Sequence, residues 1–331
     1  MAITKFGKEI ILQVYKLGED GIAEVKLEVS SLRIDFDIKN MMGYNRAKFS
    51  IYNLNNTTIK DLSNEERFIR IAISLHGREP VSLGDDFYIS NTVTEVKLPN
   101  VITTLYCMSG RRRSFMEKQV KEAYTLGTLE EVVAKLLQAA KATDITTKFE
   151  LFPEKIEVYK PQKTKEPRFD GSVENELIKL SKMYNFNYYL QNNKLRIVYN
   201  ANTPATYVSS GLSTKEKEEV VVIPIANLRS NPKVGTGTIQ VETNMDGSIL
   251  PGDILDTHNM ITASTESSFE YLVAADQGLK AAATRFSKYS IYSVVHKGSN
   301  YTGDWSTLLL GTTAKNGNSL SQQHFKWFGG S

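Results

Sequence analysis

Short runs of strictly alternating apolar and polar residues fill the N-terminal third of the sequence and restrict it to β-strands. From Leu32 to Lys39, every second residue is apolar and the residues between them are charged. A period of two places the apolar side chains on one face of a strand. A similar run, Ala47–Tyr52, follows a short loop containing Gly43, which predicts a hairpin. Further runs at 69–75, 87–94 and 101–108 predict a β-barrel or sandwich over residues 1–110.

The pattern changes to helical spacing after residue 110. Thr128 and Glu131 have the spacing of a capping box, and apolar residues follow on one helical face. Ser172 predicts the start of a second helix, and 186–199 reads as a hairpin. We therefore expect a small α+β middle domain over 111–200. The β pattern returns over 201–314, with one helical segment at 274–287, and 315–331 reads as a flexible tail. Gly84-Asp85 and Gly252-Asp253 each precede an apolar strand, which suggests that the two β regions are related.

Composition limits the class of protein. The chain of 331 residues has 40 basic and 37 acidic residues, a net charge of +3 that gives little reason to predict a nucleic-acid binder. No apolar run is long enough to span a membrane, and the first nine residues lack the apolar core of a secretory signal. One cysteine, Cys107, excludes an intramolecular disulfide framework. We expect a soluble protein of a reducing cytosol. Its 16 Tyr and 14 Phe suit sheets and interfaces.

The sequence shows no motif of an active site. No His-Glu-x-x-His or Gly-x-Ser-x-Gly is present, and Cys107 is interpreted as a buried residue. Gly235–Thr238 resembles half of a dinucleotide fingerprint but leads into a strand, so it reads as a turn. The four histidines are far apart in the sequence: His76, His258, His296 and His324. We predict no catalytic residue, no cofactor and no metal site.

Two features have a functional and a structural interpretation. Arg111–Arg113 could contact DNA or an acidic partner, but a solvated loop leaving the first barrel is favoured because the net charge is small. His296 and Trp305 lie on consecutive predicted strands, and a buried packing pair is favoured over catalysis.

Several segments, taken together, carry a resemblance to a known family. The predicted hairpin 36–54 ends in an aromatic-Asn-Leu step at Tyr52, Asn53 and Leu54. Gly171 lies in a Phe-Asp-Gly-Ser entry into a leucine-rich helix. The most specific segments are Leu250–Leu255, which contains Pro251, Gly252 and Asp253, and the stretch from Tyr292 through His296 to Asp304 and Trp305. Across residues 30–311 the chain resembles the central baseplate hub proteins of contractile-tailed bacteriophages, which are related in fold to the N-terminal part of type VI secretion spike proteins.

The resemblance implies a mainly β (α+β) fold with two tube-like β-barrel domains joined by the α+β domain. It implies a homotrimer whose six barrels form a ring, matching the sixfold tail tube to the threefold central spike. The implied partners are tail tube protein, spike protein, tape measure protein and other baseplate proteins, with DNA only in transit through the channel and no membrane. The implied location is the tail baseplate of the virion, assembled in the host cytoplasm.

Two other functions remain open on the residues alone. A receptor- or glycan-binding tail component would also use exposed aromatic residues. The other is a cell-wall hydrolase, since some hub assemblies carry lysozyme-like domains, although the sequence shows no sign of such a domain. In the C-terminal segment, we expect Phe325, Trp327 and Phe328 to dock onto a neighbouring protein, since exposed aromatics are unfavourable on a free polar tail.

Overall fold

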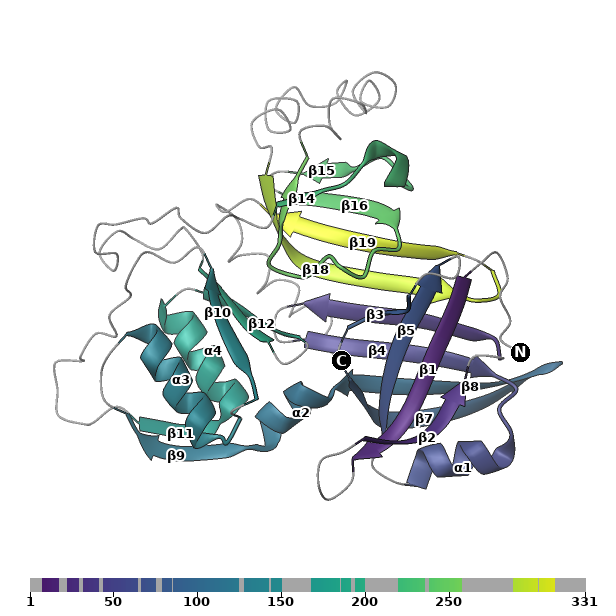
Figure 1. Cartoon of the computed structure of the whole chain (residues 1–331), viewed down its shortest axis with the longest axis horizontal. Helices are drawn as coiled ribbons and strands as arrows, with labels where there is room; N and C mark the ends of the chain where they lie inside the picture. Colours follow the sequence, from purple (N-terminus) through teal and green to yellow (C-terminus); the bar gives the residue numbers. More distant parts are fainter. Residues whose placement is uncertain are drawn as a thin grey trace.

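One 14-stranded sheet dominates the structure (Figure 1), and its main path runs β15-β16-β19-β18-β3-β4-β8-β7-β5-β1-β2. This computed structural model describes residues 8–17, 23–29, 32–41, 44–64, 67–75, 79–84, 86–124, 128–142, 144–150, 168–184, 186–191, 194–199, 220–235, 238–257, 288–302 and 304–312. The N-terminal strands of the sheet are β1 (Lys8–Leu17), β2 (Ala23–Val29), β3 (Ile34–Met41), β4 (Tyr44–Tyr52), β5 (Phe68–Leu75), β6 (Val81–Ser82), β7 (Phe87–Lys97) and β8 (Asn100–Ser109). The C-terminal strands are β14 (Val220–Val222), β15 (Lys233–Gly235), β16 (Thr238–Asn244), β17 (Ile254–Asp256), β18 (Lys288–Ser299) and β19 (Trp305–Thr312), with a short 3-10 helix at Ile225–Asn227.

The sheet contains two four-stranded units with the same strand order. The first unit is β3-β4-β8-β7 and the second is β15-β16-β19-β18. In each unit, one hairpin supplies the first two strands and a later hairpin supplies the last two in reverse order. The registers also correspond. Aligning Arg46–Tyr52 of β4 with Thr238–Asn244 of β16 aligns their partners Met108–Ile102 of β8 with Thr312–Ser306 of β19.

A β-bulge lies at the same place in both units. The bulge in β7 falls between Ile89 and Asn91, and the bulge in β18 falls between Ile291 and Ser293. The alignment of β8 with β19 makes Ile89 equivalent to Ile291. Since a bulge adds one residue and changes the local twist, its repetition means that the two units share both the pairing register and the position of this distortion. The two β regions predicted from the sequence are therefore related.

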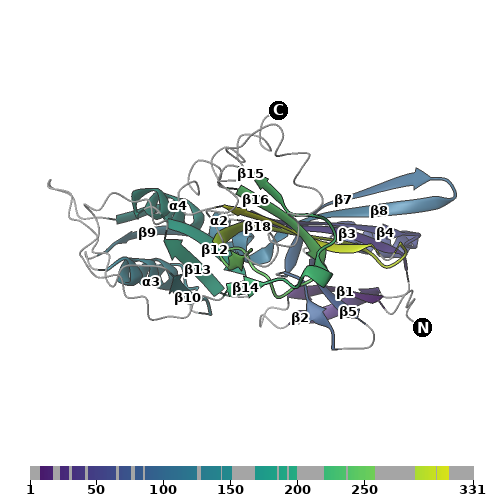
Figure 2. The same ribbon diagram turned by 90° about the horizontal axis from the view of Figure 1, so that it is seen from above.

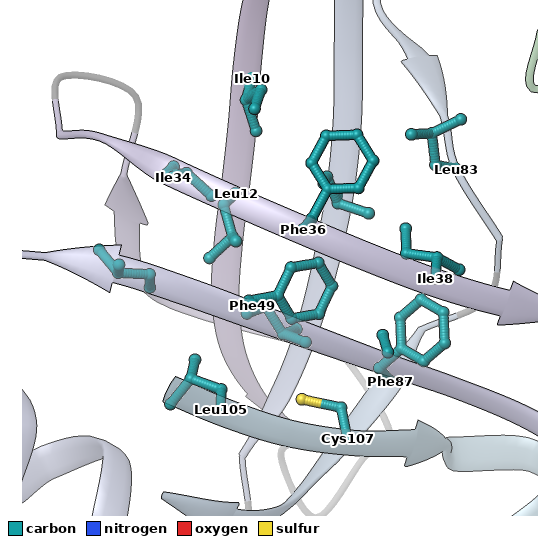
Figure 3. Close-up of a cluster of buried hydrophobic side chains, with 14 of the residues drawn as sticks. Ile10, Leu12, Ile34, Phe36, Ile38, Phe49, Leu83, Phe87, Leu105 and Cys107 are labelled. Atoms are coloured by element: carbon teal, nitrogen blue, oxygen red, sulfur yellow. The ribbon is translucent and has the colours of Figure 1, made fainter. Parts of the chain in front are cut away.

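The first β region folds back on itself to enclose a core. Strands β1 and β5 cross over β3 and β4, and apolar side chains from the two layers meet between them (Figure 3). Phe49 and Phe87 contact edge to face, with ring centroids 6.0 Å apart. Cys107 is buried in this core, and burial raises the pKa of its thiol well above the ordinary value. A separate cluster around Val241, Ile291 and Leu309 forms the core of the second β region.

A small α+β unit lies beside the sheet (Figure 1) and has its own apolar core. Its elements are α2 (Gly110–Glu117), β9 (Gln119–Ala123), α3 (Leu129–Ala139), β10 (Thr146–Glu150), β11 (Arg168–Ser172), α4 (Val173–Tyr184), β12 (Phe186–Gln191) and β13 (Lys194–Tyr199). The capping box of Thr128 and Glu131 forms as predicted, and the Ser172 hydroxyl accepts a hydrogen bond from Asn175 N–H at the start of α4. The prediction of a mainly β fold with an α+β unit in the middle of the chain is confirmed.

Three details differ from the sequence predictions. Helix α1 (Asn56–Asn64) is capped by the Asn55 side chain, which accepts from Thr58 N–H at 2.7 Å, rather than by Asn56 or Thr57. Gly84 and Gly252 are not equivalent, because Gly84 precedes β7 whereas Gly252 precedes β17. The second β region shares one sheet with the first. The predicted helical segment 274–287 lies outside the described residues.

Candidate functional site

The candidate functional surfaces of this protein are the junctions between its three parts and the free edges of its sheet. The central junction is the pairing of β18 with β3, which runs antiparallel from Ser293↔Met41 to Ser299↔Asp35. Lys297 Nζ lies 3.7 Å from Asp37 Oδ2 across it. We call this pairing the internal seam. It makes one sheet from the two units by pairing strands that are more than 200 residues apart in the sequence.

Polar side chains hold one end of the internal seam. The Asn300 side chain donates to Leu32 O at 2.7 Å and accepts from Ile34 N–H at 2.8 Å. Asp35 accepts hydrogen bonds from Ser299 Oγ at 2.5 Å and Tyr52 Oη at 2.9 Å. Partial burial and the bond to Asp35 raise the pKa of Tyr52. Because both backbone and side-chain groups are matched, the register of the seam is fixed.

The Arg33 guanidinium completes this cluster. It donates to Asp35 Oδ2 at 3.1 Å and lies over the rings of Tyr52 and Tyr301, 4.1 and 4.9 Å from their centroids. A cation between two aromatic faces is held by their quadrupoles. These residues thus contact one another within the chain, and their contacts stabilise the internal seam.

The middle unit docks on the turn Pro251–Asp253, part of the family-like segment. Arg196 of β13 donates to Pro251 O at 3.2 Å and to Asp253 Oδ1 at 2.9 Å. Gly252 has φ +97°, and a side chain there would meet Tyr189 and Val198 at 3.3 Å. Glycine is therefore required by the backbone and by the close approach of the β12–β13 hairpin. Sequence reasoning singled out the turn and missed Arg196, which no local pattern marks.

The predicted solvated loop at Arg111–Arg113 is wrong, because these residues form helix α2 and each has an acidic partner. Arg111 pairs with Asp144, Arg112 with Glu174 at 3.0 Å, and Arg113 with Glu117 at 2.7 Å. Burial raises the pKa of Glu174, and Arg112 opposes this shift. Helix α2 leads from the first β region into the middle unit. The ion pairs of Arg111 and Arg112 thus tie this helix to the rest of the middle unit.

The aromatic-Asn-Leu step lies where β4 ends. Asn53 adopts φ 60°, and its side chain accepts from Val101 N–H at 2.9 Å and donates to Asn100 at 3.2 Å. Asparagine tolerates this left-handed conformation better than most residues. Leu54 is buried in the first core. The step therefore fixes the β7–β8 hairpin turn to the end of β4. Gly171, in β11, lies close to Glu176 of α4, 3.0 Å from where a Cβ would be.

His296, Asp304 and Trp305, from the family-like stretch 292–305, lie in or next to β18 and β19. His296 and Trp305 are buried, as predicted, but each has its own partner. His296 Nδ1 lies 3.0 Å from Thr307 Oγ1, and burial lowers the pKa of His296 to about 4. Trp305 packs edge to face on Phe36 and donates to Ser299 O at 2.8 Å. Asp304 is exposed and accepts from Arg229 at 2.9 Å.

The remaining predictions concern residues of which little is described. Phe325, Trp327 and Phe328 lie outside the described residues, as do His76, His258 and His324. Within the described ranges, no group of three or more His, Cys, Asp or Glu residues could hold a metal ion. No helix in those ranges is both long enough and apolar enough to cross a membrane.

No family model matches the sequence, and no curated protein matches it. Similar solved structures include the tail protein from Neisseria meningitidis MC58, with 10% identity, 93% of this chain, 97% of that chain and a TM-score of 0.49. The 43 kDa tail protein of prophage MuSo2 from Shewanella oneidensis has 9% identity, 92% and 98% coverage and a TM-score of 0.48. The E. coli c3393 protein, a type VI secretion component, has 8% identity, 85% and 73% coverage and a TM-score of 0.47. The matches are thus phage tail and type VI secretion proteins, the class that the sequence resembles. At these identities and TM-scores, they assign no residue a role.

Proposed function

We propose that the chain is a structural hub of a phage tail baseplate, acting as a homotrimeric ring around a central channel. The observation that carries this proposal is the repetition of one four-stranded unit, with the same order, register and bulge, twice in one chain. Three chains contain six such units. A ring of them can present sixfold-like positions to a tail tube.

The middle unit gives the same ring a threefold character. Each chain has two four-stranded units but one α+β unit, fixed by the buried Arg196–Asp253 pair. A trimer would therefore carry three α+β units around six strand units. This is the geometry needed to join a sixfold tube to a threefold spike, and it requires interfaces rather than an active site.

The proposed partners follow from this geometry. One rim of the ring binds the tail tube protein, the opposite side carries the central spike, and other baseplate proteins surround it. The channel passes the tape measure protein and then DNA. Weak net charge suits a channel through which DNA slides. The hub assembles in the host cytoplasm, and its place in the virion is the tail baseplate.

Copy number tests the proposal. Native mass spectrometry of the purified full chain, and protein quantification in assembled tails, should both give three copies per ring. Six or twelve copies per tail would contradict the adapter role. A peptidoglycan-hydrolysis assay on the same sample should show no activity, and measured hydrolysis would favour an enzyme instead.

A further inference from the structure

The outer edge of the first unit is unpaired over most of its length. Strand β7 pairs with β5 at Phe87 and Tyr88, and Ile89 N–H donates to Arg67 O at 3.0 Å. In the described part of the chain, no other strand pairs with that edge of β7. The β7–β8 hairpin projects beyond the rest of the sheet (Figure 2), and side chains 94–97 of β7 are exposed. The opposite end of the sheet is β15, which pairs only with β16 among the described strands.

In the second unit, the equivalent edge is occupied. The edge of β18 pairs with β17 at its start, Ile254↔Ser290, and with β3 after the bulge. The equivalence of β7 and β18 makes Tyr88 equivalent to Ser290, so β17 corresponds to β5. The place that β3 takes beside β18 is therefore the place left open beside β7.

The repeat also specifies which strand fits there. Strand β3 is the first strand of its unit, and its counterpart in the other unit is β15. With β4 aligned on β16, Asp37 corresponds to Lys233, because their partners Lys48 and Gln240 correspond. Aligning β7 on β18 in the same way makes Glu95 correspond to Lys297.

The charges at these positions are complementary. In the internal seam, Lys297 lies opposite Asp37. Transferring that register places Glu95 opposite Lys233, an ion pair of reversed polarity at the same position. Both side chains are exposed in the single chain, where Glu95 Oε2 lies 2.7 Å from Lys97 Nζ.

We propose that β7 of one copy pairs antiparallel with β15 of a second copy, with Glu95 opposite Lys233, in the register that β18 and β3 use within the chain. This contact rests on the proposed ring and gives it its intermolecular seam. An edge of β-prone sequence with which no described strand pairs, such as Thr92–Lys97, is an aggregation hazard, and pairing with another copy removes that hazard.

The two edges cannot meet within one protomer. Seven strand spacings separate β15 from β7, and at about 4.8 Å each this is roughly 34 Å along the sheet. A disulfide requires Cα atoms within about 7 Å. Any bond between cysteines at positions 95 and 233 therefore joins two copies.

Cysteine trapping tests the register. The full chain with Glu95→Cys and Lys233→Cys is oxidised and run on a non-reducing gel; the native Cys107 is buried and stays unreactive. We expect linked species that end at a closed trimer. The matched control is Val93→Cys with Lys233→Cys, which shifts the pair by two residues to roughly 7–8 Å and should link poorly. Each single variant alone should give no ring, and a mixture of the two should give dimers.

Charge reversal supplies a second measurement. Glu95→Lys or Lys233→Glu should weaken self-association about fivefold per seam, and the double reversal should restore it. Trimers in light scattering without the 95–233 bond would overturn the seam and leave the ring standing. Disulfide-linked oligomers of more than three chains, without a closed trimer, would support the seam and overturn the trimer. Monomers without any bond would overturn both.

Discussion

Arg196 and Asp253 form a 2.9 Å ion pair between the middle unit and the turn before β17, and each side chain is only 7% exposed. Removing one member leaves the other charge buried without its partner, which costs about 3–5 kcal/mol. We expect Arg196→Ala to lower the free energy of unfolding by that amount in urea titrations. Replacing both residues by apolar ones, Arg196→Met with Asp253→Leu, should recover much of the loss.

The control for this pair is Asp304→Ala. Asp304 also pairs with an arginine, Arg229 at 2.9 Å, but its side chain is 80% exposed. Exposed pairs contribute about 0–1 kcal/mol. If Asp304→Ala and Arg196→Ala lowered the free energy of unfolding equally, burial would not govern the strength of the contact between the middle unit and the turn Pro251–Asp253.

Gly298 tests the packing of the internal seam. A Cβ at this position would lie 2.6 Å from Phe36 Cζ and 3.1 Å from Trp305 Cδ1. Gly298→Ala should therefore destabilise the fold by about 1–3 kcal/mol through overpacking. Adding Phe36→Leu makes room, so the double variant should be less unstable than the sum of the two single changes. Ser306→Ala, on the neighbouring strand, should change stability by less than about 0.5 kcal/mol.

His296 makes stability depend on pH. Burial lowers its pKa from 6.5 to about 4 in the folded protein, so below pH 6.5 the unfolded chain binds a proton that the folded chain does not. Stability should fall between pH 6.5 and pH 4, by about 3 kcal/mol in total, and show no further loss from this group below pH 4. His296→Gln, measured by urea unfolding at pH 7, 5.5 and 4, should show a shallower decline. An unchanged slope would contradict the assignment.

The C-terminal aromatics are tested by truncation. Deleting the residues after Gly317 removes Phe325, Trp327 and Phe328, and we expect the protomer to fold with unchanged circular dichroism. Pull-down of spike and adjacent baseplate proteins should weaken, because the docking aromatics are gone. Undiminished binding would place the contacts wholly on the sheet units.

Local chemistry made part of this structure predictable. The alternation at 34–52 and the capping box at Thr128 act over a few residues, so the hairpin and helix α3 follow from sequence alone. The internal seam does not, because Asp37 and Lys297 are brought together by pairing across 260 residues. The bulges at Ser90 and Tyr292 also lack a common residue signal. The repeat is therefore carried by backbone register rather than by sequence.

The prediction of a solvated loop at Arg111–Arg113 failed for a related reason. A run of three charges reads as solvated, but Arg112 finds its partner Glu174 in a helix 62 residues later. Asn53 and Gly252 both adopt positive φ, a backbone conformation that restricts the residue type directly. No local sequence pattern indicated their partners, Asn100 and Tyr189.

The internal seam also changes the mass action of assembly. Because β18 and β3 are joined in one polypeptide, half of the seams of a six-unit ring form during folding and lose no translational freedom on association. Ring closure then depends on the third power of chain concentration rather than on the sixth. A covalently paired unit can thus close rings at concentrations where separate units would remain dispersed.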